Sequence, residues 1–102
     1  MPVGVLIMMP GASQEMYEQV TEKMFGQAPF DPADAPEGMI LHTAGPVPDG
    51  WYVYDVWESK EQFQRFAQER VGPAMQEISG GQMRGPDPQF FEIANLVKAG
   101  GA

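Results

Sequence analysis

A histidine and an aspartate are the side chains of this sequence best suited to proton transfer. His42 is the single histidine of the chain, and imidazole is the side chain that gains and loses a proton near neutral pH. Asp55 stands in the middle of the apolar stretch WYVYDVW, where an ionised carboxylate is costly unless it is paired. The two are candidate catalytic residues, with Asp55 orienting an imidazole that acts as general acid or base.

Each of these residues also has a structural interpretation. His42 could form a hydrogen bond within a strand and take no part in chemistry. Asp55 could be bonded to backbone groups, or to Arg65 or Arg70. The distinction depends on whether the two side chains meet, and therefore on how the strands that carry them are paired.

Three further side chains are candidates for substrate binding. Trp51 and Trp57 offer flat apolar walls to a planar ligand, although they could equally fill a core. Asn95 could hydrogen-bond a substrate oxygen or satisfy backbone groups at a sheet edge. Tyr17 belongs to an apolar helical stripe and is expected in the core.

No motif of the sequence indicates a cofactor or a metal. The chain has no cysteine and one histidine, which falls short of the usual metal-ligand sets. No glycine-rich phosphate loop stands between a strand and a helix, and no nucleophile elbow is found. We therefore expect neither a metal nor an organic cofactor.

The apolar pattern predicts the elements that position these residues. Helices are expected after two serine N-caps, Ser13 and Ser59, the second of which opens a capping box with Gln62. Gly72-Pro73 is expected to interrupt the second helix, with Pro73 in the first turn of a short helix that runs on to Ile78. The predicted strands cover residues 3–9, 39–44, 51–58 and 89–97, and the predicted irregular segments cover residues 26–38 and 79–89.

The predicted order is β-α-β-β-α-β, in one domain over residues 1–102. This is the split βαβ pattern of a ferredoxin-like α+β fold, in which right-handed crossovers put both helices on one face of a four-stranded antiparallel sheet. The second and third strands form a hairpin centred near residue 48. His42 then lies opposite residue 54 or residue 55, so a contact with Asp55 depends on the register.

One face of the sheet is left without helices, yet neither set of alternating strand residues is polar. An exposed patch of that kind is rare on monomers, and we expect a twofold homodimer, sheet against sheet, that encloses a cavity. Because an unpaired carboxylate beneath the helices is costly, Asp55 is assigned to this dimer cavity. The same assignment puts Trp51, Val53 and Trp57 in the cavity, and Tyr52, Tyr54 and Val56 nearer the helices.

The segment WESKEQF (57–63) closes a strand and opens a helix. It resembles the W-E-S-x-E-x-F segment of the dimeric α/β-barrel superfamily, which includes the antibiotic-biosynthesis-monooxygenase-like domains. Residues 42–59 are also similar to small actinobacterial members, many without an assigned activity. Chain length, element order and the Ser59 cap extend the resemblance over nearly the whole chain.

The resemblance implies a homodimer and a monooxygenase-like enzyme of secondary or aromatic metabolism. A base would remove a proton from a planar, hydrophobic, oxygenated metabolite, and the anion would react with O₂ without an organic cofactor. His42, assisted by Asp55, is the expected base. Haem-degrading relatives carry a histidine late in the helix that follows the motif, whereas residues 60–78 contain none, so haem ligation is not expected.

Charge narrows the range of partners. The chain carries 14 acidic against 6 basic residues and a net charge of −8, which disfavours nucleic acid and anionic membrane surfaces. The apolar start, residues 1–9, has no basic flank and is too short to span a membrane, so we expect a cytoplasmic protein. The alternatives to a monooxygenase-like enzyme are an isomerase or cyclase on the same scaffold, a non-catalytic dimer that binds a small ligand, and a dimer with a filled barrel.

Overall fold

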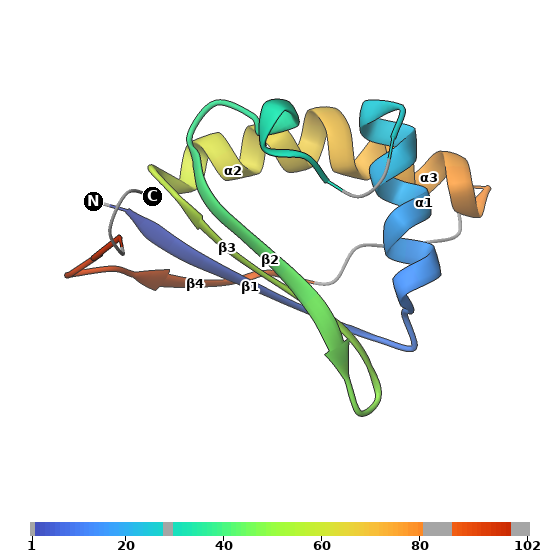
Figure 1. Ribbon diagram of the computed structural model, residues 1–102, viewed down its shortest axis with the longest axis horizontal. Coiled ribbons are helices and arrows are strands. Elements are labelled where there is room, and N and C mark those ends of the chain that lie inside the picture. Colours follow the sequence, from blue (N-terminus) through green and yellow to red (C-terminus); the bar gives the residue numbers. More distant parts are fainter. Residues whose placement is uncertain (1, 28–29, 81–86, 99–102) are drawn as a thin grey trace.

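The computed structural model describes residues 2–27, 30–80 and 87–98. It has an α+β fold, in which the helices lie above one face of a four-stranded antiparallel sheet (Figure 1). The order of the strands across the sheet is β2-β3-β1-β4. The described strands are β1 (Val3–Pro10), β2 (Met39–Val47), β3 (Gly50–Trp57) and β4 (Gln89–Glu92), and the α-helices are α1 (Gln14–Phe25), α2 (Lys60–Phe66) and α3 (Gly72–Ser79).

The predicted α+β class and antiparallel sheet are therefore confirmed. The order along the chain is compatible with a ferredoxin-like arrangement, with α1 between β1 and β2 and the α2–α3 segment between β3 and β4. Within the described ranges, no helix is long and apolar enough to cross a membrane.

Both predicted serine caps are formed. The Ser13 hydroxyl accepts a hydrogen bond from the N–H of Met16 at 3.2 Å and opens α1. The Ser59 hydroxyl accepts from the N–H of Gln62, also at 3.2 Å, and opens α2. Each cap satisfies a backbone donor that the first helical turn leaves unpaired, which fixes where each helix begins.

The second helix does not stop at Gly72-Pro73. A π-helical segment (Ala67–Val71) joins α2 directly to α3, and the N–H of Gly72 bonds to the carbonyl of Ala67, five residues back. Proline lacks an N–H and crowds the preceding helical turn. The wider π turn accommodates Pro73 at the first turn of α3. The short helix expected after Pro73 is therefore present, but no break separates it from the helix before it.

The β2–β3 hairpin fixes the register that the sequence left open. Its turn is the two-residue segment Pro48-Asp49, and β2 extends to Val47 rather than ending near residue 44. The strands pair without interruption from Val47 opposite Gly50 to His42 opposite Asp55. The register shift of this ladder lies farther from the turn, between Met39 and Leu41, so it does not disturb the His42–Asp55 pair.

The assignment of β3 side chains to the two faces of the sheet was wrong. Asp55 lies on the helix side, where its side chain contacts His42 and approaches α1. Trp57 packs on the same side against two α2 rings, Phe63 and Phe66. The face without helices carries the other β3 residues, including Tyr52 and Tyr54, whose rings lie over Gly45 and Gly4 of the neighbouring strands.

The reason is that the buried carboxylate is paired. Asp55 receives hydrogen bonds from the rings of both His42 and Trp57. A buried charge is tolerated when its acceptor sites are filled by donors. The desolvation argument that placed Asp55 away from the helices therefore did not apply.

The last strand is shorter than predicted. β4 ends at Glu92, and the N–H of Ile93 bonds to the carbonyl of Pro2 before the chain leaves the sheet. Asn95 lies beyond this point and is exposed. Most of the irregular stretch predicted over residues 79–89, together with residues 28–29 of the first predicted loop, lies outside the described residues.

Candidate functional site

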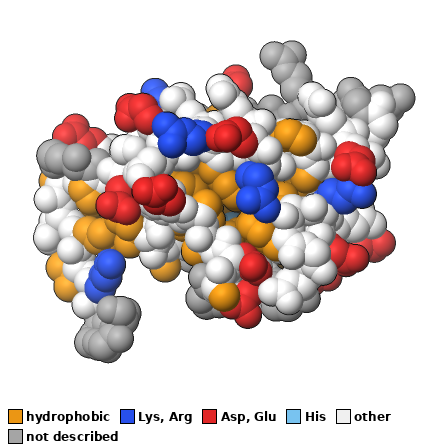
Figure 2. Space-filling view, turned by 90° about the horizontal axis from the view of Figure 1, so that it is seen from above, with side chains coloured by type: hydrophobic (Ala, Val, Ile, Leu, Met, Phe, Trp, Pro, Cys, Tyr) orange, Lys and Arg blue, Asp and Glu red, His pale blue; other side chains and the backbone are white. Residues whose placement is uncertain are grey.

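A pocket of about 620 Å³ lies between the helix layer and the sheet. Its volume falls within the range of about 300–1,000 Å³ that is usual for small-molecule sites. Seen from above, hydrophobic side chains gather in the middle of the helix-bearing face, with charged side chains around them (Figure 2). The wall includes five methionines from four elements, whose flexible side chains suit an apolar ligand of irregular shape: Met9, Met16, Met24, Met39 and Met75.

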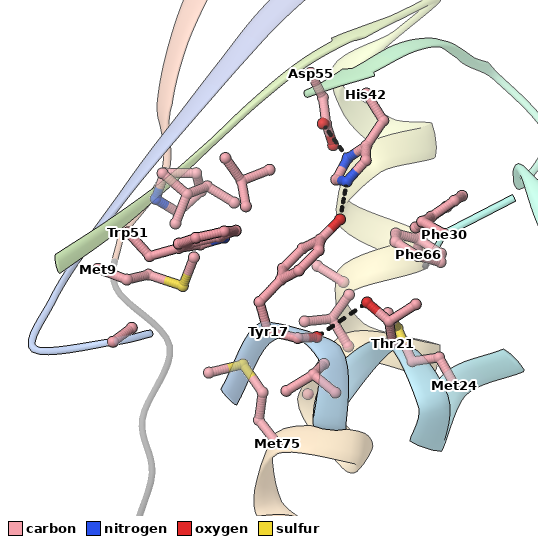
Figure 3. A pocket seen from close by; sticks show the side chains of 18 of the residues that line it. Met9, Tyr17, Thr21, Met24, Phe30, His42, Trp51, Asp55, Phe66 and Met75 are labelled. Carbon is pink, nitrogen blue, oxygen red and sulfur yellow. Dashed lines mark hydrogen bonds and ion pairs between the residues drawn. The ribbon is translucent and has the colours of Figure 1, made fainter. Parts of the chain in front are cut away.

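Three polar side chains from three elements form a hydrogen-bonded chain at the wall of this pocket (Figure 3). The Nδ1 atom of His42 lies 2.7 Å from an oxygen of Asp55, and the Nε2 atom of the same ring bonds to the hydroxyl of Tyr17. The side chains of His42 and Asp55 are 17% and 5% exposed. The chain is therefore largely shielded from water and ends at the Tyr17 hydroxyl.

The direction of each hydrogen bond follows from the carboxylate. An ionised carboxylate only accepts hydrogen bonds, so the Nδ1 atom of His42 carries the hydrogen that it shares with Asp55. The Nε2 atom of a neutral ring is then an acceptor, and the Tyr17 hydroxyl donates to it. Trp57 donates to the second oxygen of Asp55 at 3.2 Å. A proton on Tyr17 consequently points at a basic nitrogen.

The phenol of Tyr17 keeps its proton more firmly than an exposed tyrosine. Burial raises the pKa of Tyr17, a hydrogen bond with Thr21 offsets part of this rise, and the negative charge of Asp55 adds to the effect of burial. Burial and the charge of Asp55 both disfavour the tyrosinate. At neutral pH Tyr17 is therefore protonated and can relay a proton, and it is not a tyrosinate that could act as a base by itself.

An aromatic side chain from the loop after α1 covers the imidazole. The ring of Phe30 stacks on His42 with centroids 4.7 Å apart and planes 26° from parallel. Phe30 also makes an edge-on contact with Phe25 at the end of α1. The loop thus contributes a wall of the site, which agrees with the general association of long ordered loops with function.

The structure brings together some of the predicted site residues and not others. His42 and Asp55, whose contact the sequence left dependent on the hairpin register, do meet, and Trp51 lines the pocket. Trp57 lies in the core behind the site, where its indole bonds to Asp55, and it is not a pocket-lining residue. Asn95 is exposed beyond β4 and does not line the pocket.

The alternative in which an arginine pairs with Asp55 is also excluded by the structure. Asp55 is bonded to His42 and Trp57, while Arg70 donates to the carbonyl of Met24 at the end of α1. Arg65 is exposed on α2.

Tyr17 is the site residue that the sequence interpretation missed. It was assigned to the core as part of an apolar helical stripe. That stripe does face the sheet, but a pocket lies between the two. A signal was present, because Thr21 is a second polar residue one turn later on the same face. Thr21 is buried, and its hydroxyl donates to the Tyr17 carbonyl at 3.0 Å. For Phe30 the sequence offered no comparable signal.

Metal ligation finds no support in the part of the chain that the structure describes, where no three His, Cys, Asp or Glu side chains are grouped to hold an ion. A comparison of the sequence with models of known protein families and with curated proteins found no match. Functional inference accordingly starts from the geometry of the pocket.

Proposed function

We propose that the protein is a small enzyme that removes a proton from a planar, hydrophobic, oxygenated metabolite, in the manner of the cofactor-independent monooxygenase-like members of the dimeric α/β-barrel superfamily. The proposal is carried by one observation, the Tyr17–His42–Asp55 chain at the wall of an otherwise apolar pocket. Such a chain of hydrogen bonds can carry a proton from a ligand in the apolar pocket to the imidazole.

Proton transfer follows the direction of the hydrogen bonds. The oxygen of Tyr17 accepts a proton from an acidic O–H or C–H of the substrate as its own proton passes to the Nε2 atom of His42. The imidazolium that forms is stabilised by the carboxylate of Asp55, 2.7 Å from Nδ1. Tyr17 and His42 are the catalytic residues of this step, and Asp55 is a positioning residue.

The substrate anion then reacts with O₂. For a CH₂ group conjugated with a carbonyl through an aromatic ring, as in 9-anthrone, the carbanion adds O₂ and takes up a proton to give a hydroperoxide. Loss of water converts the hydroperoxide to a ketone, so that CH₂ and O₂ become C=O and H₂O. His42 supplies a proton to the departing oxygen by way of Tyr17. The apolar wall favours this sequence because it keeps out water that would reprotonate the anion.

Oxygen uptake with 9-anthrone tests the proposal. One O₂ should be consumed for each anthraquinone formed, and His42→Gln should lower kcat by about a hundredfold or more. Gln64→Ala, a change of an exposed residue on α2, is the matched control and should leave kcat unchanged. A His42→Gln variant with wild-type turnover would show that the proposed base is wrong.

The methionine-rich wall also supports a second function, reversible binding of an apolar metabolite without catalysis. Exchange of the acidic C–H of 9-anthrone with D₂O in the absence of O₂ separates the possibilities. Exchange together with oxygen uptake supports the monooxygenase-like reaction, and exchange without uptake supports an isomerase or cyclase. Binding without exchange supports the non-catalytic function.

We further infer that two copies of the chain pair through the sheet face without helices. That face carries Leu41, Phe91 and Met8 with exposed fractions of 47%, 47% and 39%. The hydroxyl of Tyr54 lies 2.7 Å from where a side-chain carbon on Gly4 would stand, so the ring lies flat across the strand. A flat apolar surface favours association, and it is the opposite face from the pocket.

A further inference from the structure

Among the buried side-chain nitrogen and oxygen atoms of the described residues, the Nε1 atom of Trp51 has no hydrogen-bond partner. The residue is 6% exposed, so bulk solvent does not reach this donor. Buried side-chain donors in folded proteins are nearly always bonded. An indole N–H without a protein partner beside a pocket therefore points to a hydrogen-bond acceptor on a ligand.

The second tryptophan shows that the fold can satisfy such a donor. Trp57 also lies in β3 on the helix side of the sheet, and its Nε1 atom donates to Asp55 at 3.2 Å. Trp57 does not line the pocket, whereas Trp51 does. The tryptophan without a partner is thus the one that a ligand can approach.

The free donor lies on the same wall as the proton relay. The rings of Trp51 and Tyr17 pack with centroids 5.4 Å apart and planes tilted by 35°, and the indole of Trp51 reaches toward Tyr17 (Figure 3). A ligand whose edge contacts Tyr17 therefore brings a neighbouring atom close to the indole. That atom has to be a hydrogen-bond acceptor if it is to satisfy the N–H.

We propose that Trp51 is a specificity-determining residue, whose indole N–H donates a hydrogen bond to a carbonyl or phenolate oxygen of the ligand. Resting on the proposed function, this requires a substrate whose acceptor oxygen is conjugated with the acidic O–H or C–H. Removal of that proton spreads negative charge onto the acceptor oxygen. The hydrogen bond from Trp51 then strengthens as the anion forms, which favours the reaction over simple binding.

Binding of a matched pair of probes tests the assignment without any reaction. 2-Acetylnaphthalene has an acceptor oxygen, and 2-isopropylnaphthalene has nearly the same shape without one. Equilibrium dialysis should show that Trp51→Phe weakens binding of the acetyl probe by about three- to tenfold more than binding of the isopropyl probe, as expected for one hydrogen bond. An equal loss of affinity for both probes would mean that Trp51 contributes apolar contact alone, and it would overturn the proposal.

A spectroscopic measurement on the unsubstituted protein keeps the proposal testable if Trp51→Phe does not fold. The chain has two tryptophans and therefore two indole N–H signals in a ¹⁵N-labelled sample. The acetyl probe should shift the Trp51 signal downfield, the isopropyl probe should not, and Trp57→Phe identifies the remaining signal as that of Trp51. Equal responses to the two probes would contradict the assignment.

Failure of the role proposed for Trp51 can be distinguished from failure of the proposed enzymatic function. Tyr17→Phe should leave the preference for the acetyl over the isopropyl probe unchanged. The same variant should weaken the binding of 2-naphthol relative to that of 2-methylnaphthalene. If turnover is never found but the acetyl preference depends on Trp51, the ligand-binding role stands and the enzymatic function falls. If turnover depends on His42 but the probes do not discriminate, the enzymatic function stands and the role of Trp51 falls.

Discussion

His42 and Asp55 occupy directly opposed positions on β2 and β3, and their side chains meet at 2.7 Å on the helix side of the sheet. Both residues lie inside regular strands, so the backbone ladder of the hairpin fixes the separation of their side chains. Groups held on strands are placed more accurately than groups on loops. The imidazole is consequently oriented before a ligand binds, and Tyr17 bonds to it from the helix layer.

The first prediction concerns the charge on Asp55. Asp55→Asn keeps the size of the side chain, but its amide can donate to Nδ1 and so favours the ring tautomer with hydrogen on Nε2. Tyr17 then loses its acceptor. We expect kcat for proton abstraction to fall by about a hundredfold or more, measured as C–H exchange of 9-anthrone in D₂O.

Asp49→Asn is the control for this change, because Asp49 is exposed in the hairpin turn and should not affect exchange. Circular dichroism confirms that both variants are folded. An Asp55→Asn protein that exchanges at the wild-type rate would remove Asp55 from the mechanism and leave it a structural role beside Trp57.

The second prediction follows from the raised pKa of Tyr17. On a rise in pH, the unfolded chain loses this proton before the folded chain does, because the unfolded pKa is about 10. Between the two pKa values the folded state binds more protons, so the free energy of unfolding decreases as pH rises. Below the unfolded value the contribution is fully present.

Urea unfolding at about pH 9 and about pH 11, on either side of the ordinary tyrosine value, measures this effect. The loss of stability between the two conditions should be smaller in Tyr17→Phe than in the wild type. Tyr52→Phe, on the opposite face of the sheet, is the control for other groups that titrate at high pH. Equal losses in wild type and Tyr17→Phe would contradict the shift.

Local signals in the sequence were sufficient for the helix starts and for the α+β class. The caps at Ser13 and Ser59 depend on residues three positions apart, so their chemistry is readable from the chain itself. The His42–Asp55 contact was within reach because the turn confined the register to two choices, and Pro48-Asp49 selects one of them.

The features that sequence reasoning missed depend on pairing across the fold. The face of β3 was misassigned because the donors that satisfy Asp55 belong to another strand and to a tryptophan two residues away. Tyr17 was assigned to the core because a helical stripe is the same whether it meets packed side chains or a pocket wall. The end of β4 was overestimated because an apolar run continues past Glu92 without a pairing partner.

The third prediction compares the two tryptophans. Trp57→Phe and Trp51→Phe delete the same atoms, but Trp57 loses a bond to a buried carboxylate and leaves a void in the core. Trp51 loses an N–H that has no partner within the protein. We expect Trp57→Phe to lower the free energy of unfolding by about 2 kcal/mol more than Trp51→Phe.

Urea unfolding curves of the two variants, with equal slopes, provide this measurement. The result is independent of any ligand, so it tests the structure of the site without assuming its function. Equal costs for the two substitutions would mean that the bond between Trp57 and Asp55 adds nothing to stability.

The last prediction addresses the sheet face without helices. Leu41 and Phe91 lie on this face, and each is 47% exposed in the single chain. Leu41→Glu and Phe91→Glu each place a carboxylate there. A monomer tolerates such a change, whereas a twofold interface would bury two like charges without partners. Each variant should weaken dimerisation by at least about a hundredfold, measured by sedimentation equilibrium at micromolar concentration.

Gln64→Glu adds the same charge to the exposed side of α2 and should leave the dimer intact, which separates an interface effect from general repulsion in a chain of net charge −8. Unfolding curves of the glutamate variants, recorded under conditions where they are monomeric, should match those of the diluted wild type. A wild-type chain that sediments as a monomer at every concentration would exclude the dimer. Because the pocket and its polar chain belong to a single copy, that outcome would leave the proton relay in place.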